Sequence, residues 1–233
     1  MERELQKRIL SSIILVPLSF FFIVKGSYFF IFFLIITFFA TGFEWLRMSK
    51  SVTLKTAGFI FLFFSFLFAY LLRTEQGYKI FLFVILISIL TDIGGYIFGK
   101  VFKGPKLTKI SPKKTYSGVI GSFVLSIVGS LIFIEYVEGL ETLLGYLNFR
   151  TINPQSIYTS SLDLDLFILL FILISSSISQ LGDLIISYFK RIAEIKDTGK
   201  ILPGHGGLLD RIDGIIFNVP FVYLILKFVG YLF

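Results

Sequence analysis

The residues best suited to chemistry lie between Ser187 and Asp213, in the stretch SYFKRIAEIKDTGKILPGHGGLLDRID. Two aspartates stand three residues apart there, Asp210 and Asp213, close to His205, the only histidine of the chain. Neighbouring carboxylates repel one another, so this spacing favours a cation between or beside them. Oxygen ligands without cysteines or clustered histidines suit a hard ion such as Mg²⁺, which takes one or two carboxylates, water and phosphate oxygens.

A third carboxylate, Asp183, ends a long apolar run. If the helix continues past the membrane surface, Asp183, Ser187 and Lys190 share one face, because they are spaced i, i+4 and i+7. A carboxylate at membrane depth is costly and usually faces a protein interior or a water-filled cavity. Asp183 is therefore expected to share a divalent ion with Asp210. A salt-bridge network with Lys190 and Arg211 is the alternative.

The glycines of LPGHGG are expected to shape the loop before the last span. Gly204, Gly206 and Gly207 permit positive φ and let backbone N–H groups approach an anion closely. His205 is interpreted as a hydrogen-bonding loop residue and not as a catalytic base. The chain has no Walker A, G-x-S-x-G or H-E-x-x-H pattern and no cysteine, which leaves P-loop, serine-hydrolase, zinc-protease and thiol chemistry without support.

Two upstream segments also carry candidate residues. SPKKTYSG combines lysines with hydroxyl groups that suit phosphate contacts, at Ser111, Lys113, Lys114 and Thr115. The alternative is that its lysines only set membrane topology. TDIGGYIFGK places Asp92 inside an apolar helix, and an intramembrane aspartate is a functional candidate by default.

The elements that must position these residues are membrane helices. Of the 233 residues 55% are hydrophobic, 30 are Phe, and the mean hydropathy is +0.87. A membrane-spanning helix needs about 20 apolar residues, and runs of that kind predict an all-α, polytopic integral membrane protein with about seven spans. The first is interpreted as a retained span and not a removed signal peptide. The expected spans are residues 9–24, 26–43, 56–72, 80–98, 119–134, 166–186 and 214–233.

The charged loops predict the orientation of these spans. The basic N-terminus, the Arg47 loop, the lysine-rich loop 99–118 and the loop 187–213 all fall on one side, which the positive-inside rule makes cytoplasmic. The net charge of +7 is thereby assigned to topology and not to nucleic-acid binding. We divide the chain into N-terminal helices, residues 1–79, and a catalytic membrane region, residues 80–233. Both polar loops face the same side and can form one site.

The stretch from Ser187 to Asp213 resembles the C-terminal signature of the phosphatidate cytidylyltransferases, or CDP-diacylglycerol synthases. That signature reads S-x-x-K-R-x-x-x-x-K-D-x-G followed by P-G-H-G-G-x-x-D-R-x-D. The segments TDIGGYIFGK, SPKKTYSG and EWLRM resemble further family segments. The fixed positions of the C-terminal signature are filled here by Ser187, Lys190, Arg191, Lys196, Asp197, Gly199, Pro203, Gly204, His205, Gly206, Gly207, Asp210, Arg211 and Asp213.

The resemblance implies transfer of CMP from CTP to phosphatidic acid, with Mg²⁺ and a second cation such as K⁺. It implies a site facing the cytoplasm of a prokaryotic membrane, and it allows a homodimer. Metal ligation is then expected from Asp183, Asp210 and Asp213. Neutralisation of phosphate charge is expected from Lys190, Arg191 and Arg211. Substrate contacts are expected from Asp92, Ser111, Lys113, Lys114, Thr115, Ser187, Lys196, Asp197, Gly204, His205, Gly206 and Gly207.

Two other functions remain open at this stage. A related CTP-dependent enzyme, such as a CDP-archaeol synthase or a polyprenol kinase, would use similar phosphate chemistry on another lipid. An ion-coupled transporter would line its path with Asp92, Asp183 and Asp210. Transport predicts polar residues that continue across the membrane, whereas the last four spans become apolar on the other side apart from Asn218.

Overall fold

The computed structural model describes residues 2–108, 110–137, 161–202, 204 and 206–232. Over these ranges the chain is α-helical, and its extended pairing is limited to two isolated bridges, Lys106 with Thr115 and Leu202 with Gly206. The helices are α1 (Glu2–Lys25), α2 (Ser27–Met48), α3 (Val52–Gln76), α4 (Tyr78–Phe102), α5 (Tyr116–Tyr136), α7 (Ser161–Ile192), α8 (Leu209–Ile212) and α9 (Ile215–Leu232).

A helix covers most of each expected span. Five helices in the described ranges are long and apolar enough to cross a membrane, namely α2, α3, α4, α5 and the Leu166–Ile192 part of α7. The first and last expected spans correspond to the shorter apolar stretches Ile13–Lys25 and Ile215–Phe228. The prediction of an all-α polytopic membrane protein is therefore confirmed.

Two helix boundaries bear on the site. Helix α7 continues to Ile192, beyond the expected end of its span, as the shared face of Asp183 and Lys190 requires. The two aspartates of DRID, however, do not share one helix. Asp210 lies on the single turn α8, while Asp213 lies in the turn before α9, where its Oδ1 accepts the N–H of Gly214 at 3.0 Å. A side chain that binds a nearby backbone amide competes with helix continuation.

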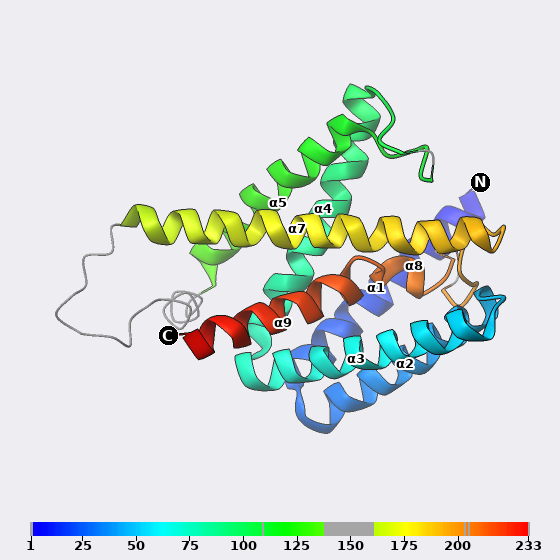
Figure 1. The fold of residues 1–233 in the computed structure, drawn as a ribbon, viewed down its shortest axis with the longest axis horizontal. Helices are drawn as coiled ribbons and strands as arrows, with labels where there is room; N and C mark the ends of the chain where they lie inside the picture. The colour runs from blue at the N-terminus through cyan, green and yellow to red at the C-terminus, as the bar shows by residue number, and fades with distance from the viewer. Residues whose placement is uncertain (1, 109, 138–160, 203, 205, 233) are drawn as a thin grey trace.

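Helices α4 and α5 form a closely packed pair that crosses α7 steeply, whereas α9 and α3 run more nearly along α7 (Figure 1). Glycines permit this close approach. A Cβ atom at Gly94 would collide with the Gly121 carbonyl oxygen, and one at Gly118 would lie 2.8 Å from the Gly95 oxygen. Small residues at such crossings are typical of membrane helices. The pair brings Asp92 of α4 close enough to Lys114, just before α5, for the two charges to interact.

A small apolar cluster supports the end of the bundle where the polar loops meet. It consists of the buried residues Trp45, Met48, Leu62, Ile186, Leu209 and Ile216. These come from α2, α3, α7, α8 and α9, so the cluster joins both halves of the chain. The Trp45 indole also donates to the Leu54 carbonyl oxygen at 3.0 Å. The proposed division at residue 79 falls at the start of α4 and stays a prediction.

Candidate active site

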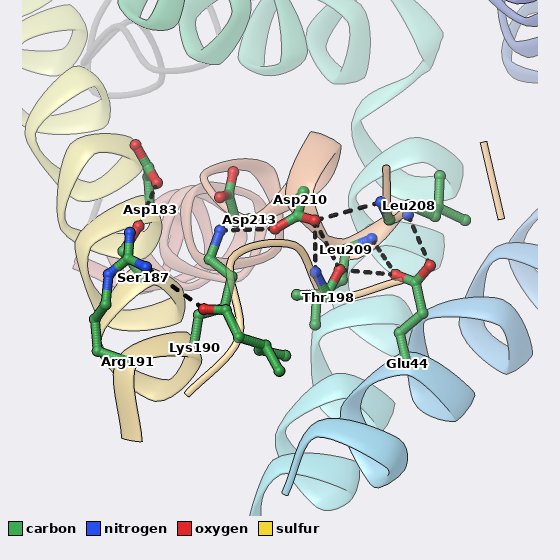
Figure 2. A network of polar contacts seen from close by, with 12 residues as sticks. Glu44, Asp183, Ser187, Lys190, Arg191, Thr198, Leu208, Leu209, Asp210 and Asp213 are labelled. Carbon is green, nitrogen blue, oxygen red and sulfur yellow. Dashed lines mark hydrogen bonds and ion pairs between the residues drawn. The ribbon is translucent and has the colours of Figure 1, made fainter. Parts of the chain in front are cut away.

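One face of α7 carries three of the expected site residues (Figure 2). Ser187 Oγ donates to Asp183 Oδ1 at 3.2 Å, across one helical turn. Lys190 Nζ reaches away from the helix to Asp210 Oδ1 at 2.7 Å, and both side chains of this ion pair are about nine-tenths buried. The shared face predicted from the sequence is therefore present, and it links α7 to the loop before α9.

Three carboxylates gather beside α7. Asp183 lies within hydrogen-bonding reach of Asp213, and Asp92 of α4 is close enough to interact electrostatically with both. Lys114 Nζ lies 2.6 Å from Asp183 Oδ2 and supplies the nearest positive charge. Burial, together with the negative charges of Asp183 and Asp92, raises the pKa of Asp213 well above its usual range. A bound cation would relieve this repulsion.

Asp210 is held differently from the other two expected metal ligands. Its Oδ2 accepts the Thr198 N–H at 2.7 Å and the Gly207 N–H at 3.3 Å, and it lies 3.0 Å from the Thr198 hydroxyl oxygen. Its Oδ1 binds Lys190. A carboxylate oxygen has two acceptor positions, so Oδ1 retains capacity for a further partner. Asp210 therefore organises the loop whether or not it also binds an ion.

Two glycines of the glycine-rich loop have the positive φ expected of them, but the Gly206 and Gly207 amides bind protein oxygens. Gly204 and Gly206 have φ values of +78° and +88°. The Gly206 N–H donates to Leu202 O at 3.2 Å, and the Gly207 N–H donates to Asp210. In this structure protein oxygens thus occupy two of the amide donors that were expected to face an anion. Pro203 and His205 lie outside the described residues.

Glu44, near the end of α2, belongs to the site but was not among the expected residues. It is 1% exposed, and its carboxylate accepts hydrogen bonds from the Leu208 and Leu209 amides at 3.0 and 2.8 Å (Figure 2). The sequence holds one signal for it, because a glutamate within an otherwise apolar helix is costly and needs partners. EWLRM was identified only as a family landmark, without a role for its glutamate.

The remaining expected residues surround this centre. Arg191 Nε donates to Ile110 O at 3.3 Å, which ties α7 to the α4–α5 loop and confirms that the two polar loops meet. Thr115 caps α5 by accepting the Gly118 amide at 3.1 Å. Arg211 is exposed and interacts electrostatically with Asp92. Four other expected residues lie at the periphery and make none of the carboxylate contacts above: Ser111, Lys113, Lys196 and Asp197.

A metal ion at this site would need ligands in addition to the protein side chains. Among residues 2–108, 110–137, 161–202, 204 and 206–232, no three His, Asp or Glu side chains are close enough to hold an ion by themselves. Asp183 and Asp213 offer two adjacent carboxylates. This set fits Mg²⁺, which commonly binds one or two carboxylates and completes its shell with water and phosphate oxygens.

Comparison with known proteins identifies relatives of this chain. The model of the Cytidylyltransferase family matches residues 56–229. A phosphatidate cytidylyltransferase of Staphylococcus saprophyticus is 37% identical over 162 residues, which cover 68% of this chain and 54% of the relative. One from Staphylococcus aureus (strain COL) is 38% identical over 163 residues, covering 69% and 54%. The chain spans about half the length of the curated relatives it matches.

Proposed function

The chain belongs to the cytidylyltransferase family, and from this premise we propose that it transfers CMP from CTP to phosphatidic acid. A phosphate oxygen of phosphatidic acid attacks the α-phosphorus of CTP. The bond from that phosphorus to the bridging oxygen breaks, and the products are CDP-diacylglycerol and pyrophosphate. The observation that carries the proposal is the meeting of the α7 carboxylate Asp183, the α4–α5 loop lysine Lys114 and the DRID aspartates in one site.

The site is suited to two anionic substrates. The second pKa of a phosphate monoester is about 6, so the attacking group is largely dianionic at neutral pH and needs no strong base. The reaction needs charge neutralisation and alignment instead. Lys114 and Arg211 interact with the carboxylates, and Arg191 adds positive charge from the last turn of α7, where it binds the Ile110 carbonyl oxygen. Because the Gly206 and Gly207 amides bind protein oxygens, these side chains are expected to make most of the phosphate contacts.

The proposed metal ligands are Asp183, Asp210 and Asp213. The first and last are adjacent, and Asp210 would contribute through Oδ1. When bound, Mg²⁺ would neutralise phosphate charge and polarise the α-phosphate for attack. Lys190 would keep Asp210 oriented, and Lys114 would do the same for Asp183. A second cation such as K⁺ belongs to the same proposal.

The orientation of the site is also a proposal. The chain is a membrane protein, and its relatives include bacterial proteins. Lysines and arginines concentrate at the end of the bundle where the two polar loops meet, which by the positive-inside rule is the cytoplasmic end. CTP would then reach the site from the cytoplasm, and phosphatidic acid would reach it from the bilayer.

Turnover by the purified protein in detergent tests the proposed function. CTP, phosphatidic acid and Mg²⁺ are supplied, and pyrophosphate and CDP-lipid are both measured. Equal formation of the two products, lost in Asp210→Asn, is the expected result. Turnover only with an archaeal or polyprenyl phosphate acceptor would change the lipid substrate. No turnover with any acceptor would overturn the proposal.

Lys114→Ala is expected to raise the apparent KM for CTP. Removal of the ammonium group takes away a positive charge 2.6 Å from Asp183. The triphosphate then loses an attractive partner and is repelled more strongly by the carboxylates of the site. The measurement is initial rate against CTP concentration at saturating phosphatidic acid. Lys113→Ala is the matched control, because the neighbouring lysine is exposed and makes no carboxylate contact. An unchanged KM in Lys114→Ala would limit this lysine to setting topology.

A further inference from the structure

Glu44 connects the N-terminal helices to the loop that carries Asp210. Its Oε1 accepts the Leu208 amide, and its Oε2 accepts the Leu209 amide and lies 3.1 Å from the Thr198 hydroxyl, whose single proton goes to either Glu44 or Asp210. These partners lie more than 150 positions away in the sequence. One side chain of α2 therefore contacts both ends of the segment that runs from Thr198 to Leu209.

The loop is shaped around this carboxylate. A Cβ atom at Gly199 would collide with Glu44 Oε1, and one at Gly207 would lie 2.9 Å from Oε2. The close approach of Glu44 thus explains glycine at position 199, whereas at position 207 Thr198 Oγ1 is the nearest atom and Glu44 adds to the crowding. These protein contacts account for both glycines without a bound phosphate.

Thr198 links Glu44 to Asp210. Its hydroxyl lies 3.1 Å from Glu44 Oε2 and 3.0 Å from Asp210 Oδ2, and its amide donates to the same Asp210 oxygen. Asp210 in turn binds Lys190. Figure 2 shows these side chains as one continuous chain of contacts from α2 to α7.

The part of α2 that carries Glu44 is anchored by buried apolar residues. Its neighbour Trp45 and, one turn on, Met48 are both buried in the apolar cluster that also contains Leu209. Its own side chain is 1% exposed, so it does not reach a substrate. Any effect on the reaction must pass through the residues that it holds.

We infer that Glu44 is a positioning residue for this site: it fixes the loop from Thr198 to Leu209 and, through Thr198, the orientation of Asp210. The inference rests on the proposed cytidylyltransferase function. With Glu44 in place, Asp210 presents Oδ1 in one orientation before any substrate arrives. Without it, the Leu208 and Leu209 amides lose their acceptor, and the loop must rearrange to satisfy them.

Glu44→Gln tests the inference, since it keeps the size of the side chain but turns one acceptor oxygen into a donor group that faces other donors. The expected result is a loss of about 10–100-fold in kcat, a range typical of changes to groups that orient a metal ligand. The Mg²⁺ concentration for half-maximal rate should also rise, while the KM for phosphatidic acid stays unchanged. In substrate-free protein, amide hydrogen exchange of residues 206–212 should become faster.

Glu75→Gln is the matched control. Glu75 also joins two helices, binding Lys227 Nζ at 2.7 Å and accepting from the Tyr223 hydroxyl at 3.2 Å. It lies near the end of α3, at the opposite end of the α2–α3 hairpin from Glu44. This variant should keep the wild-type kcat and Mg²⁺ dependence even if its melting temperature falls.

The outcomes separate this inference from the proposed function. An inactive wild type would overturn the function itself. An active wild type with wild-type kcat and Mg²⁺ dependence in Glu44→Gln would overturn the inference, even if that variant melted earlier. If Glu44→Gln does not fold, Thr198→Val decides: it removes the hydroxyl contacts with Glu44 and Asp210 but keeps the amide bond to Asp210. Changes in kcat and Mg²⁺ dependence in the same direction, together with faster amide exchange of residues 206–212, support the inference. Wild-type kinetics in Thr198→Val would then reject it.

Discussion

Asp183→Asn is expected to lower kcat by about a thousandfold while the protein stays folded. The substitution removes one of two adjacent carboxylates offered to a metal ion, and it removes the partner of Lys114. A catalytic cation supplies several kcal/mol of transition-state stabilisation, and about 4 kcal/mol corresponds to about a thousandfold in rate. Repulsion between Asp183 and Asp213 ends at the same time, which offsets the lost ion pair. The measurements are kcat and the melting temperature in detergent.

Glu194→Gln is the control for this change. It removes a negative charge from the same end of the molecule, but Glu194 is highly exposed and its nearest cation, Lys50, lies 4.0 Å away. Its activity should equal that of the wild type. If Asp183→Asn keeps more than about a tenth of the wild-type kcat, a loss of only about 1.4 kcal/mol, Asp183 does not hold the catalytic ion.

Lys190→Met is expected to lower the free energy of unfolding by about 3–5 kcal/mol. The ammonium group lies 2.7 Å from Asp210 Oδ1, and the two side chains are only 11% and 10% exposed. Removing one member of a buried pair leaves an uncompensated charge, which is the costly case. Methionine keeps the length and apolar character of the stem, so lost packing adds little. Denaturant or thermal unfolding in detergent measures the change.

The pair between Lys50 and Glu194 provides the comparison. Its side chains are 67% and 83% exposed, and such pairs contribute at most about 1 kcal/mol. Lys50→Met should therefore leave the stability nearly unchanged. Equal small losses in Lys50→Met and Lys190→Met would show that the hydrogen bonds from Thr198 and Gly207 are enough to hold Asp210.

Much of this fold was predictable from residue type alone. Apolar runs predicted all five described helices that are long enough to cross a membrane. The charged loops predicted that residues 99–118 and 187–213 meet, as the contact of Arg191 with Ile110 confirms. The spacing of Asp183, Ser187 and Lys190 predicted their shared face. The spans and the shared helix face depend on residues that are near one another in the sequence, because helix periodicity and membrane thickness set their spacing.

The arrangement across helices was not predictable in the same way. The spacing of Asp210 and Asp213 did not predict their separate partners: Asp210 binds Lys190 and the loop, while Asp213 lies within hydrogen-bonding reach of Asp183. The glycine amides were expected to face an anion, but Asp210 and Leu202 accept those of Gly207 and Gly206. The same sequence spacing is compatible with the expected partners and with the observed ones, so it could not decide between them.

The amino-acid sequence by itself determined that this is a helical membrane protein, which loops lie on one side, and which residues could handle phosphate. Only the tertiary structure decided which carboxylate meets which cation, and that Glu44 holds the loop from 165 positions away. Periodicity determines the face of a helix on which a residue lies. It does not determine how far the helix is rotated, or where it crosses its neighbours, because side-chain packing and close glycine contacts between distant segments set both.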